Sequence, residues 1–395
     1  MRAGFAFLVL ATVLSQFYRA FLAVLSPVLG AELGTTAADL ALASGLWFAV
    51  FALMQLPVGL GLDRIGPRRT VGWLFALGAG GGAALFAAAT SPGMIVAAMC
   101  LIGMGCAPVL MASFYIFARS FSARAFASLA GLLVGVAGVG NLAAAAPMAW
   151  AVETFGWRET TAALAVVTVA IGAGLLRFVA DPPREDAGAG GDGGSLADLL
   201  RIPALWAMTP LLALHYAPAA GVRGLWAGPY LEDVFGLGAS GIGLVTLGMA
   251  LAMILGNFAY GPADRVFGTR KWVLVGGNGL GAAALLALGL APGQGIATAA
   301  VLLAALGFFG SSFPLMMAHA RSYFPPGLIG RGVTLANLLA IGGVGLMQIA
   351  SGRLHGQMVA AGAPPETAYG ALFLFFGLLL ALSVAVYLVT EDRLD

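Results

Sequence analysis

The feature that most constrains this chain is the length of its uncharged, apolar stretches. Of its 395 residues, 61% are hydrophobic and only 9% are charged, whereas a soluble domain carries about 25% charged residues. Many stretches run for about twenty residues or more, the length that an α-helix needs to cross a bilayer. They lack the alternation over about ten residues that is typical of a membrane β-barrel. The chain is therefore predicted to be an all-α integral membrane protein, surrounded by a lipid bilayer.

Hydropathy predicts twelve transmembrane helices in two groups of six. The predicted spans are 4–29, 39–62, 70–90, 93–117, 125–150, 160–180, 203–229, 239–261, 272–291, 296–318, 331–352 and 368–390. Residues 181–202 are rich in Gly, Asp and Pro, a composition typical of a linker. We therefore predict an N-terminal six-helix bundle over 1–180, a cytoplasmic linker over 181–202 and a C-terminal six-helix bundle over 203–395.

Basic residues predict the orientation of these spans. Of the nineteen Lys and Arg residues, fifteen lie on the side of the two termini. Arg158 and Arg353 lie on the other side, and Arg19 and Arg223 lie within spans. Because basic residues accumulate in cytoplasmic loops, we expect both termini in the cytoplasm and the chain in a bacterial inner membrane. A net charge of +2 gives no indication of a nucleic-acid partner.

The two halves of the chain repeat one another. Matching segments are offset by 201 to 206 residues: Asp63–Arg69 with Asp264–Lys271, Ala118–Phe121 with Ala320–Tyr323, and Ser128–Leu133 with Thr334–Leu339. Two pseudo-symmetric bundles related by an axis along the membrane normal are one architecture of alternating-access transporters.

The loop after the second span carries a family resemblance. It reads Gly59-Leu60-Gly61-Leu62-Asp63-Arg64-Ile65-Gly66-Pro67-Arg68-Arg69 and fits the pattern G-x-x-x-D-R-x-G-x-R-R, which resembles the signature loop of the major facilitator superfamily (MFS). The resemblance implies the MFS fold and a secondary transporter that rocks two bundles around a central site. It implies no enzymatic activity and no cofactor, and we expect a monomer.

The same resemblance implies a latch that joins the two halves in the outward-facing state, with span eleven as the partner of Asp63. The expected latch residues are Gly59, Asp63, Arg64, Gly66, Arg68 and Arg69, with the second copy at Asp264, Arg265 and Arg270. Gly59 and Gly61 permit close helix approach, and Asp63 can lie against the positive end of a neighbouring helix. The alternative is an ordinary charged loop that only sets topology.

Arg19 and Arg223 lie inside the first and seventh predicted spans, 204 residues apart. A charge at this depth costs several kcal/mol unless it faces a cavity or a partner. All seventeen acidic residues fall in loops, tails or span ends, so we expect the substrate to supply the negative charge. The planar fork of arginine suits a carboxylate or a phosphate, and the pair resembles that of organophosphate/phosphate exchangers of the superfamily. The superfamily lines its cavity with spans one, four, seven and ten, so the resemblance implies that both guanidinium groups face it.

The alternative for each arginine is a structural role. Arg19 can extend to the outer interface, and Arg223 can form a salt bridge with Glu232 or Asp233 at the rim of the span. The further candidate binding residues are Ser15, Gln16 and Tyr18 in span one and His215 and Tyr216 in span seven. Span seven also contains Pro218, Gly221, Gly224 and Pro229, which indicate either a bend or break near Arg223 or close helix packing. His215 either titrates near neutral pH or is a hydrogen-bonded structural group.

Two other transport functions stay open. Soft sulfur ligands select Cu(I), and the candidates are Met249, Met253, Met104 and Cys100, although two cavity arginines would repel a cation. Multidrug efflux is disfavoured because Met99 stands where drug/proton antiporters of the superfamily usually have an arginine. A receptor on the same fold is a third, weaker hypothesis.

The latch hypothesis makes a prediction for Asp63. Replacement by alanine removes the carboxylate that stabilises one conformational state, so we expect Asp63→Ala to transport more slowly in an uptake assay. Transport at the wild-type rate would contradict the latch.

Overall fold

The computed structural model describes residues 2–120, 123–182, 201–324 and 329–394, and in this part of the chain the regular structure is entirely helical. The chain clusters into two compact units. Unit 1 comprises Met1–Asp186 with Leu237–Leu244, and unit 2 comprises Ala187–Gly236 with Val245–Asp395. Most of the predicted linker, residues 183–200, lies outside the described part.

The helices have the lengths that the membrane prediction requires. Ten helices of the described chain are long and apolar enough to cross a bilayer, and the bent pair formed by α1 and α2 makes an eleventh. The segment predicted as the seventh span consists of α12, α13, η2 and α14, which follow one another from residue 203 to residue 235. The predicted all-α membrane fold is thus confirmed.

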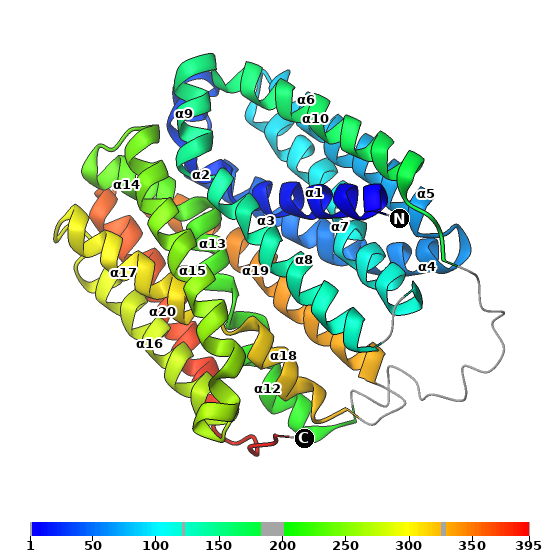
Figure 1. The fold of residues 1–395 in the computed structure, drawn as a ribbon. Coiled ribbons are helices and arrows are strands. Elements are labelled where there is room, and N and C mark those ends of the chain that lie inside the picture. The colour runs from blue at the N-terminus through cyan, green and yellow to red at the C-terminus, as the bar shows by residue number, and fades with distance from the viewer. Residues whose placement is uncertain (1, 121–122, 183–200, 325–328, 395) are drawn as a thin grey trace. The chain divides into compact units, whose positions relative to one another are not determined.

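The described residues of unit 1 form eleven helical elements, shown from blue to green in Figure 1. They are α1 (Arg2–Phe17), α2 (Leu22–Leu33), α3 (Ala37–Leu53), α4 (Gln55–Arg64), α5 (Pro67–Trp73), the π-helix η1 (Leu74–Gly80), α6 (Gly81–Ala87), α7 (Pro92–Ser120), α8 (Ala123–Ala143), α9 (Ala146–Phe155) and α10 (Trp157–Phe178). A capping box starts α3, because Thr36 Oγ1 accepts the Asp39 N–H at 3.1 Å and Asp39 accepts the Thr36 N–H at 2.9 Å. From this start, α3 packs along α7.

Unit 2 contains the remaining helices, shown from green to red. They are α12 (Pro203–Leu214), α13 (Ala217–Gly221), the π-helix η2 (Val222–Trp226), α14 (Ala227–Phe235), α15 (Ala239–Phe267), α16 (Lys271–Leu290), α17 (Ile296–Phe309), α18 (Phe313–Arg321), α19 (Ile329–Ala360) and α20 (Pro365–Tyr387). The first turns of α15 cluster with unit 1, where the Ser240 N–H and hydroxyl donate to the Glu153 carboxylate at 2.9 and 2.5 Å.

In each unit a glycine lets one helix touch the backbone of another. A Cβ at Gly140 of α8 would lie 1.9 Å from the carbonyl oxygen of Val13 in α1. A Cβ at Gly343 of α19 would lie 2.0 Å from the carbonyl oxygen of Ala213 in α12. Small residues at helix crossings permit this approach in membranes. The two arginine-bearing segments are thereby held against equivalent helices of their own units.

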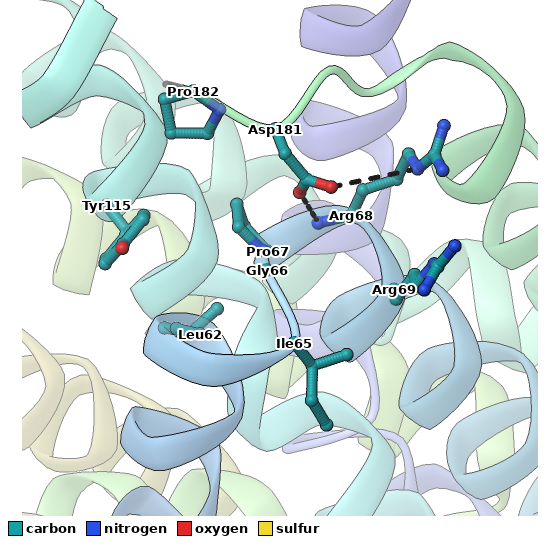
Figure 2. Close-up of a pocket in the computed structure, with 9 residues that line it drawn as sticks. All are labelled: Leu62, Ile65, Gly66, Pro67, Arg68, Arg69, Tyr115, Asp181 and Pro182. Atoms are coloured by element: carbon teal, nitrogen blue, oxygen red, sulfur yellow. Dashed lines mark hydrogen bonds and ion pairs between the residues drawn. The ribbon is translucent and has the colours of Figure 1, made fainter. Parts of the chain in front are cut away.

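In each unit, an aspartate that follows the last helix caps the first helix of the third predicted span. In unit 1, Asp181 accepts the Arg68 N–H at 2.7 Å near the start of α5, as Figure 2 shows. In unit 2, Asp392 accepts the N–H groups of Arg270 and Lys271 at 3.1 and 3.0 Å, at the start of α16. A negative charge at a helix N-terminus is stabilising. The repeat therefore extends to a pair of residues that the sequence comparison had not matched.

The segment after α20 is fixed by further hydrogen bonds. Lys271 Nζ donates to the carbonyl oxygen of Leu388 at 2.7 Å, and the Tyr323 hydroxyl donates to that of Glu391 at 2.6 Å. Thr269 also donates its hydroxyl to Asp392. Burial raises the pKa of Asp392, but its hydrogen bonds from Thr269 and from the two backbone N–H groups outweigh burial, so this pKa lies below its usual value.

The glycine contacts make the first structural prediction. Gly343→Ala must displace α19 from α12, and overpacking of this kind costs about 1–3 kcal/mol. We expect a lower melting temperature for the purified protein. Gly342→Ala is the matched control, because no heavy atom lies within 4 Å of a Cβ at that position and alanine favours a helix over glycine. Equal melting temperatures for the two variants would contradict the close contact.

The Asp392 cap makes a pH-dependent prediction. Because folding lowers this pKa, the carboxylate contributes stability above its unfolded value of about 3.9, and the contribution is lost as the pH falls through the folded value. Asp392→Asn should therefore lower the melting temperature at pH 7, and the difference from wild type should shrink in acid. Glu391→Gln is the control, since Glu391 pairs with Arg393 in a largely exposed ion pair. A difference that grows in acid would refute the assignment.

Candidate functional site

Arg19 lies at a break in the first span. The α1 helix ends at Phe17, α2 begins at Leu22, and the two are bent by 54°. At the break the Arg19 N–H bonds to the Gln16 carbonyl oxygen at 3.3 Å instead of continuing the α-helical pattern. The sequence predicted one span over residues 4–29 and gave no indication of this break. The side chain of Arg19 is half-buried.

Two aromatic rings of α3 hold the Arg19 guanidinium. Its Cζ lies 4.8 Å from the centre of the Phe51 ring and 5.3 Å from that of Trp47, and the two rings stack on each other with centres 5.2 Å apart. Cation–π contacts of this kind contribute about 0.5–1 kcal/mol each at exposed sites and more when desolvated. Neither aromatic residue was among the sequence candidates.

The other candidates of the first span surround this arginine within unit 1. The Ser15 and Cys106 side chains are both buried, and Ser15 and Arg19 both lie near the Cys106 thiol. The Tyr18 hydroxyl is 2.8 Å from that of Thr168 in α10. Gln16 is half-buried. The structure thus brings Ser15 and Arg19 together and directs Tyr18 toward α10.

Arg223 lies in the π-helix η2 and is only 2% exposed. From Pro203 to Trp226 the segment consists of α12, α13 and η2, with one break at residues 215–216 and a change from α-helix to π-helix at Val222. The predicted bend or break of this span is thus present, and Arg223 lies in the π-helical part. Such breaks free backbone groups that can serve a polar site. One of them is used by Gln348 of α19, whose Nε2 donates to the carbonyl oxygen of Gly221 at 3.2 Å.

The buried residues beyond Arg223 form an aromatic cluster that the sequence analysis missed. The Trp226 indole N–H donates to the Ser351 hydroxyl at 3.0 Å, and its ring lies 5.2 Å from that of His355. His355 in turn lies 4.6 Å from the Tyr369 ring. The Tyr369 hydroxyl donates to Asp233 at 2.5 Å, which gives that carboxylate a partner other than the expected Arg223.

His215 and Tyr216 lie at the break between α12 and α13. His215 is fully buried, and its Nδ1 lies 3.0 Å from the carbonyl oxygens of both Leu211 and Leu212. Both rings contact Phe313 of α18, with centres 5.8 Å away in each case. These contacts favour the structural role for His215.

The latch loop contains a small cavity in unit 1, lined by nine residues that Figure 2 labels. Arg68 lies on it, with its Nε 4.0 Å from the Asp181 carboxylate. The side chains of Arg64 and Arg69 are exposed, and Gly66 adopts a φ of +100° that favours glycine. Gly61 packs on Thr70, whereas among the described residues no heavy atom lies within 4 Å of a Cβ at Gly59. The side chain of Asp63 lies outside the described residues.

The second copy of the loop forms an ion pair within unit 2. Arg270 Nε lies 3.1 Å from the Asp264 carboxylate, and both side chains are mostly buried. Arg270 also donates to the carbonyl oxygen of Arg393 at 3.4 Å. Arg265 is exposed.

The sulfur residues occupy packing positions. Met249 and Met253 are both buried in α15, and each would contact a Cβ at Gly307 of α17. Cys100 and Met104 belong to α7 of unit 1. Among the described residues there is no group of three or more His, Cys, Asp or Glu side chains that could hold a metal ion.

A family model supplies the decisive comparison. Residues 8–225, more than half of the chain, match the model described as the Major Facilitator Superfamily. The chain belongs to the major facilitator superfamily. Membership of this superfamily makes it a multi-pass membrane transporter of small molecules rather than an enzyme.

Solved structures of MFS transporters share the fold. A bacterial homolog of the human lysosomal transporter Spinster, in an inward-facing and occupied conformation, matches with a TM-score of 0.75 at 17% identity, over 98% of this chain and 96% of the other. A D-xylose–proton symporter matches with 0.73 at 16% identity, over 96% of each chain. The nucleoside transporter NupG matches with 0.76 at 12% identity, over 98% and 99%. A search of curated proteins found no match.

Sequence signals for the missed residues were weak. Trp47 and Phe51 are spaced four residues apart, which places them on one face of a helix, but many aromatic residues of this chain share such spacing. Asp181 and Asp392 follow the sixth and the last span, and their offset lies outside the range used to define the repeat.

Proposed function

We propose that this MFS transporter moves a small organic or phosphate-type anion across the bacterial inner membrane. It would do so as a monomer, by rocking its two units in alternating access around a site that contains Arg19 and Arg223. Both termini would lie in the cytoplasm, as the distribution of basic residues predicts.

The observation that carries this proposal is the burial of Arg223. A 2% exposed arginine in an apolar span is expensive unless it faces a cavity or a partner, and such residues usually mark a substrate pathway. In the described part of the chain, every Asp and Glu lies in the first or last turn of a helix or beyond it. An anionic substrate would supply the charge that the interior of the spans lacks.

The backbone departs from a regular α-helix at both arginines, which supports the same proposal. Arg19 follows the end of α1, and Arg223 lies in η2, in the corresponding first and seventh spans. Broken helices at the midplane are typical of substrate sites in secondary transporters. Arginine also binds oxyanions through two parallel N–H groups, so a carboxylate or a phosphate fits better than a neutral sugar.

The driving force for transport would then come from the substrate and not from a titratable side chain of the protein. No carboxylate lies in the middle of a described span, and His215 Nδ1 already faces two carbonyl oxygens. Exchange of one anion for another, or entry of the anion together with its own proton, needs no further titratable group.

A ligand-stabilisation screen tests the proposal. The purified full-length protein is melted with succinate, benzoate, inorganic phosphate or glycerol 3-phosphate, and with D-xylose and uridine as neutral comparators. We expect at least one anion to raise the melting temperature, and we expect Arg19→Ala and Arg223→Ala each to weaken its binding about 10- to 100-fold, because a hydrogen bond to a charged group is lost.

Arg177→Ala is the matched control, because Arg177 is an exposed arginine at the end of α10. It should leave anion binding unchanged. Arg19→Lys and Arg223→Lys should fall between wild type and alanine, since lysine keeps the charge but not the planar fork. Stabilisation by neutral solutes alone, or equal stabilisation of both alanine variants and wild type, would overturn the proposal.

A further inference from the structure

The indole of Trp47 is a buried hydrogen-bond donor beside the Arg19 guanidinium. Trp47 is 1% exposed, and its Nε1 has no hydrogen-bond partner among the described residues. An indole N–H only donates, and buried donors of native proteins are nearly always bonded. A missing acceptor at such a place points to a ligand.

The Trp47 ring lies beside the Arg19 guanidinium. Cζ of Arg19 lies 5.3 Å from the centre of the Trp47 ring, which stacks on Phe51. On the other side of α3, the backbone of Trp47 is so close to α7 that a Cβ at Gly103 would lie 2.5 Å from its carbonyl oxygen. The ring is therefore fixed in place, and its face is used by the cation while its N–H projects from the edge.

We infer that the Trp47 indole N–H donates to the same oxyanion as Arg19 and is a specificity-determining residue of this transporter. The inference rests on the proposed anion site and adds a neutral donor to it. One oxygen of a carboxylate or phosphate would accept from the guanidinium and a second from the indole. The Trp47 indole and the Arg19 guanidinium can donate hydrogen bonds but cannot accept them. Together they favour a carboxylate or a phosphate, whose oxygens accept, over a hydroxyl group that must also donate.

The covering of Nε1 in this structure agrees with alternating access. A transporter closes over its substrate site in some states and opens it in others. A donor that is covered here becomes accessible in a different state of the cycle, and it is then shielded from water together with the bound anion.

One substitution at Trp47 tests the role of the indole N–H separately from that of the aromatic ring. Trp47→Phe keeps an aromatic face for Arg19 and removes the N–H. With the anion that stabilises the wild type best among succinate, benzoate, inorganic phosphate and glycerol 3-phosphate, we expect binding about 10- to 100-fold weaker, measured by melting temperature against anion concentration. Without anion, the melting temperature should be somewhat lower than that of wild type, because Phe leaves a cavity at a fully buried position. Binding is therefore compared through the rise in melting temperature that the anion causes in each variant.

Trp157→Phe is the matched control. Trp157 is 3% exposed, its Nε1 also lacks a partner among the described residues, and an arginine, Arg158, lies 4.2 Å above its ring. That arginine, however, is bonded to the carbonyl oxygens of Ala87 and Ala89. Trp157→Phe should therefore leave anion binding unchanged.

The outcomes separate this inference from the proposed function. Failure of every anion to stabilise the wild type would overturn both. Binding that depends on Arg19 but is unchanged in Trp47→Phe, or weakened equally in Trp157→Phe, would overturn the inference alone. If Trp47→Phe does not fold, the indole ¹⁵N–¹H resonances of the wild-type protein are measured instead. The Trp47 resonance is assigned as the one that is missing in Trp47→Tyr. Addition of the anion must then shift the Trp47 resonance, and an unchanged resonance would refute the donor.

Discussion

A guanidinium cation inside an apolar span must be stabilised by something other than water, and this constraint shapes both units of the protein. The described spans offer no carboxylate in their middle turns. In unit 1 the cation is placed at a helix break, over the rings of Trp47 and Phe51. In unit 2 it is placed in a π-helix and almost wholly covered. Both solutions interrupt regular backbone, and interrupted backbone in a membrane is tolerated only where protein or a polar cavity surrounds it.

The surrounding framework is built from contacts that recur in the two units. Glycines of α8 and α19 bring these helices against the backbones of α1 and α12, which precede the two arginines. Asp181 caps α5 and Asp392 caps α16, in each case by accepting hydrogen bonds from backbone N–H groups. Backbone contacts of this kind depend little on which side chains flank them. The duplicated architecture has therefore persisted at positions where the side chains of the two halves have diverged.

Fold and substrate chemistry are determined at different levels in this superfamily. The transporters with similar structures are described as a Spinster homolog, a xylose symporter and a nucleoside transporter, and they share 12 to 17% identity with this chain. Such similarity fixes the arrangement of helices but not the solute. The solute is selected by the few side chains that reach the site. In this chain we propose that role for Arg19 and Arg223, the two charged residues within the predicted first and seventh spans.

The sequence by itself determined the helical membrane fold, the superfamily, the two arginines and the break near Arg223. The superfamily came from the resemblance of the loop Gly59–Arg69 to the family signature. The other three follow from properties that each residue carries alone: transfer energy, charge, and the backbone limits of proline and glycine. The break at Arg19 has no such signal, because Phe17, Tyr18 and Ala20 all suit a continuous helix. Only the tertiary structure decided the break at Arg19, the rings that hold its guanidinium, and the caps at Asp181 and Asp392. It also decided that no described heavy atom lies within 4 Å of a Cβ at Gly59. Each of these depends on which helices approach one another and how closely, and that is a property of packing between distant segments.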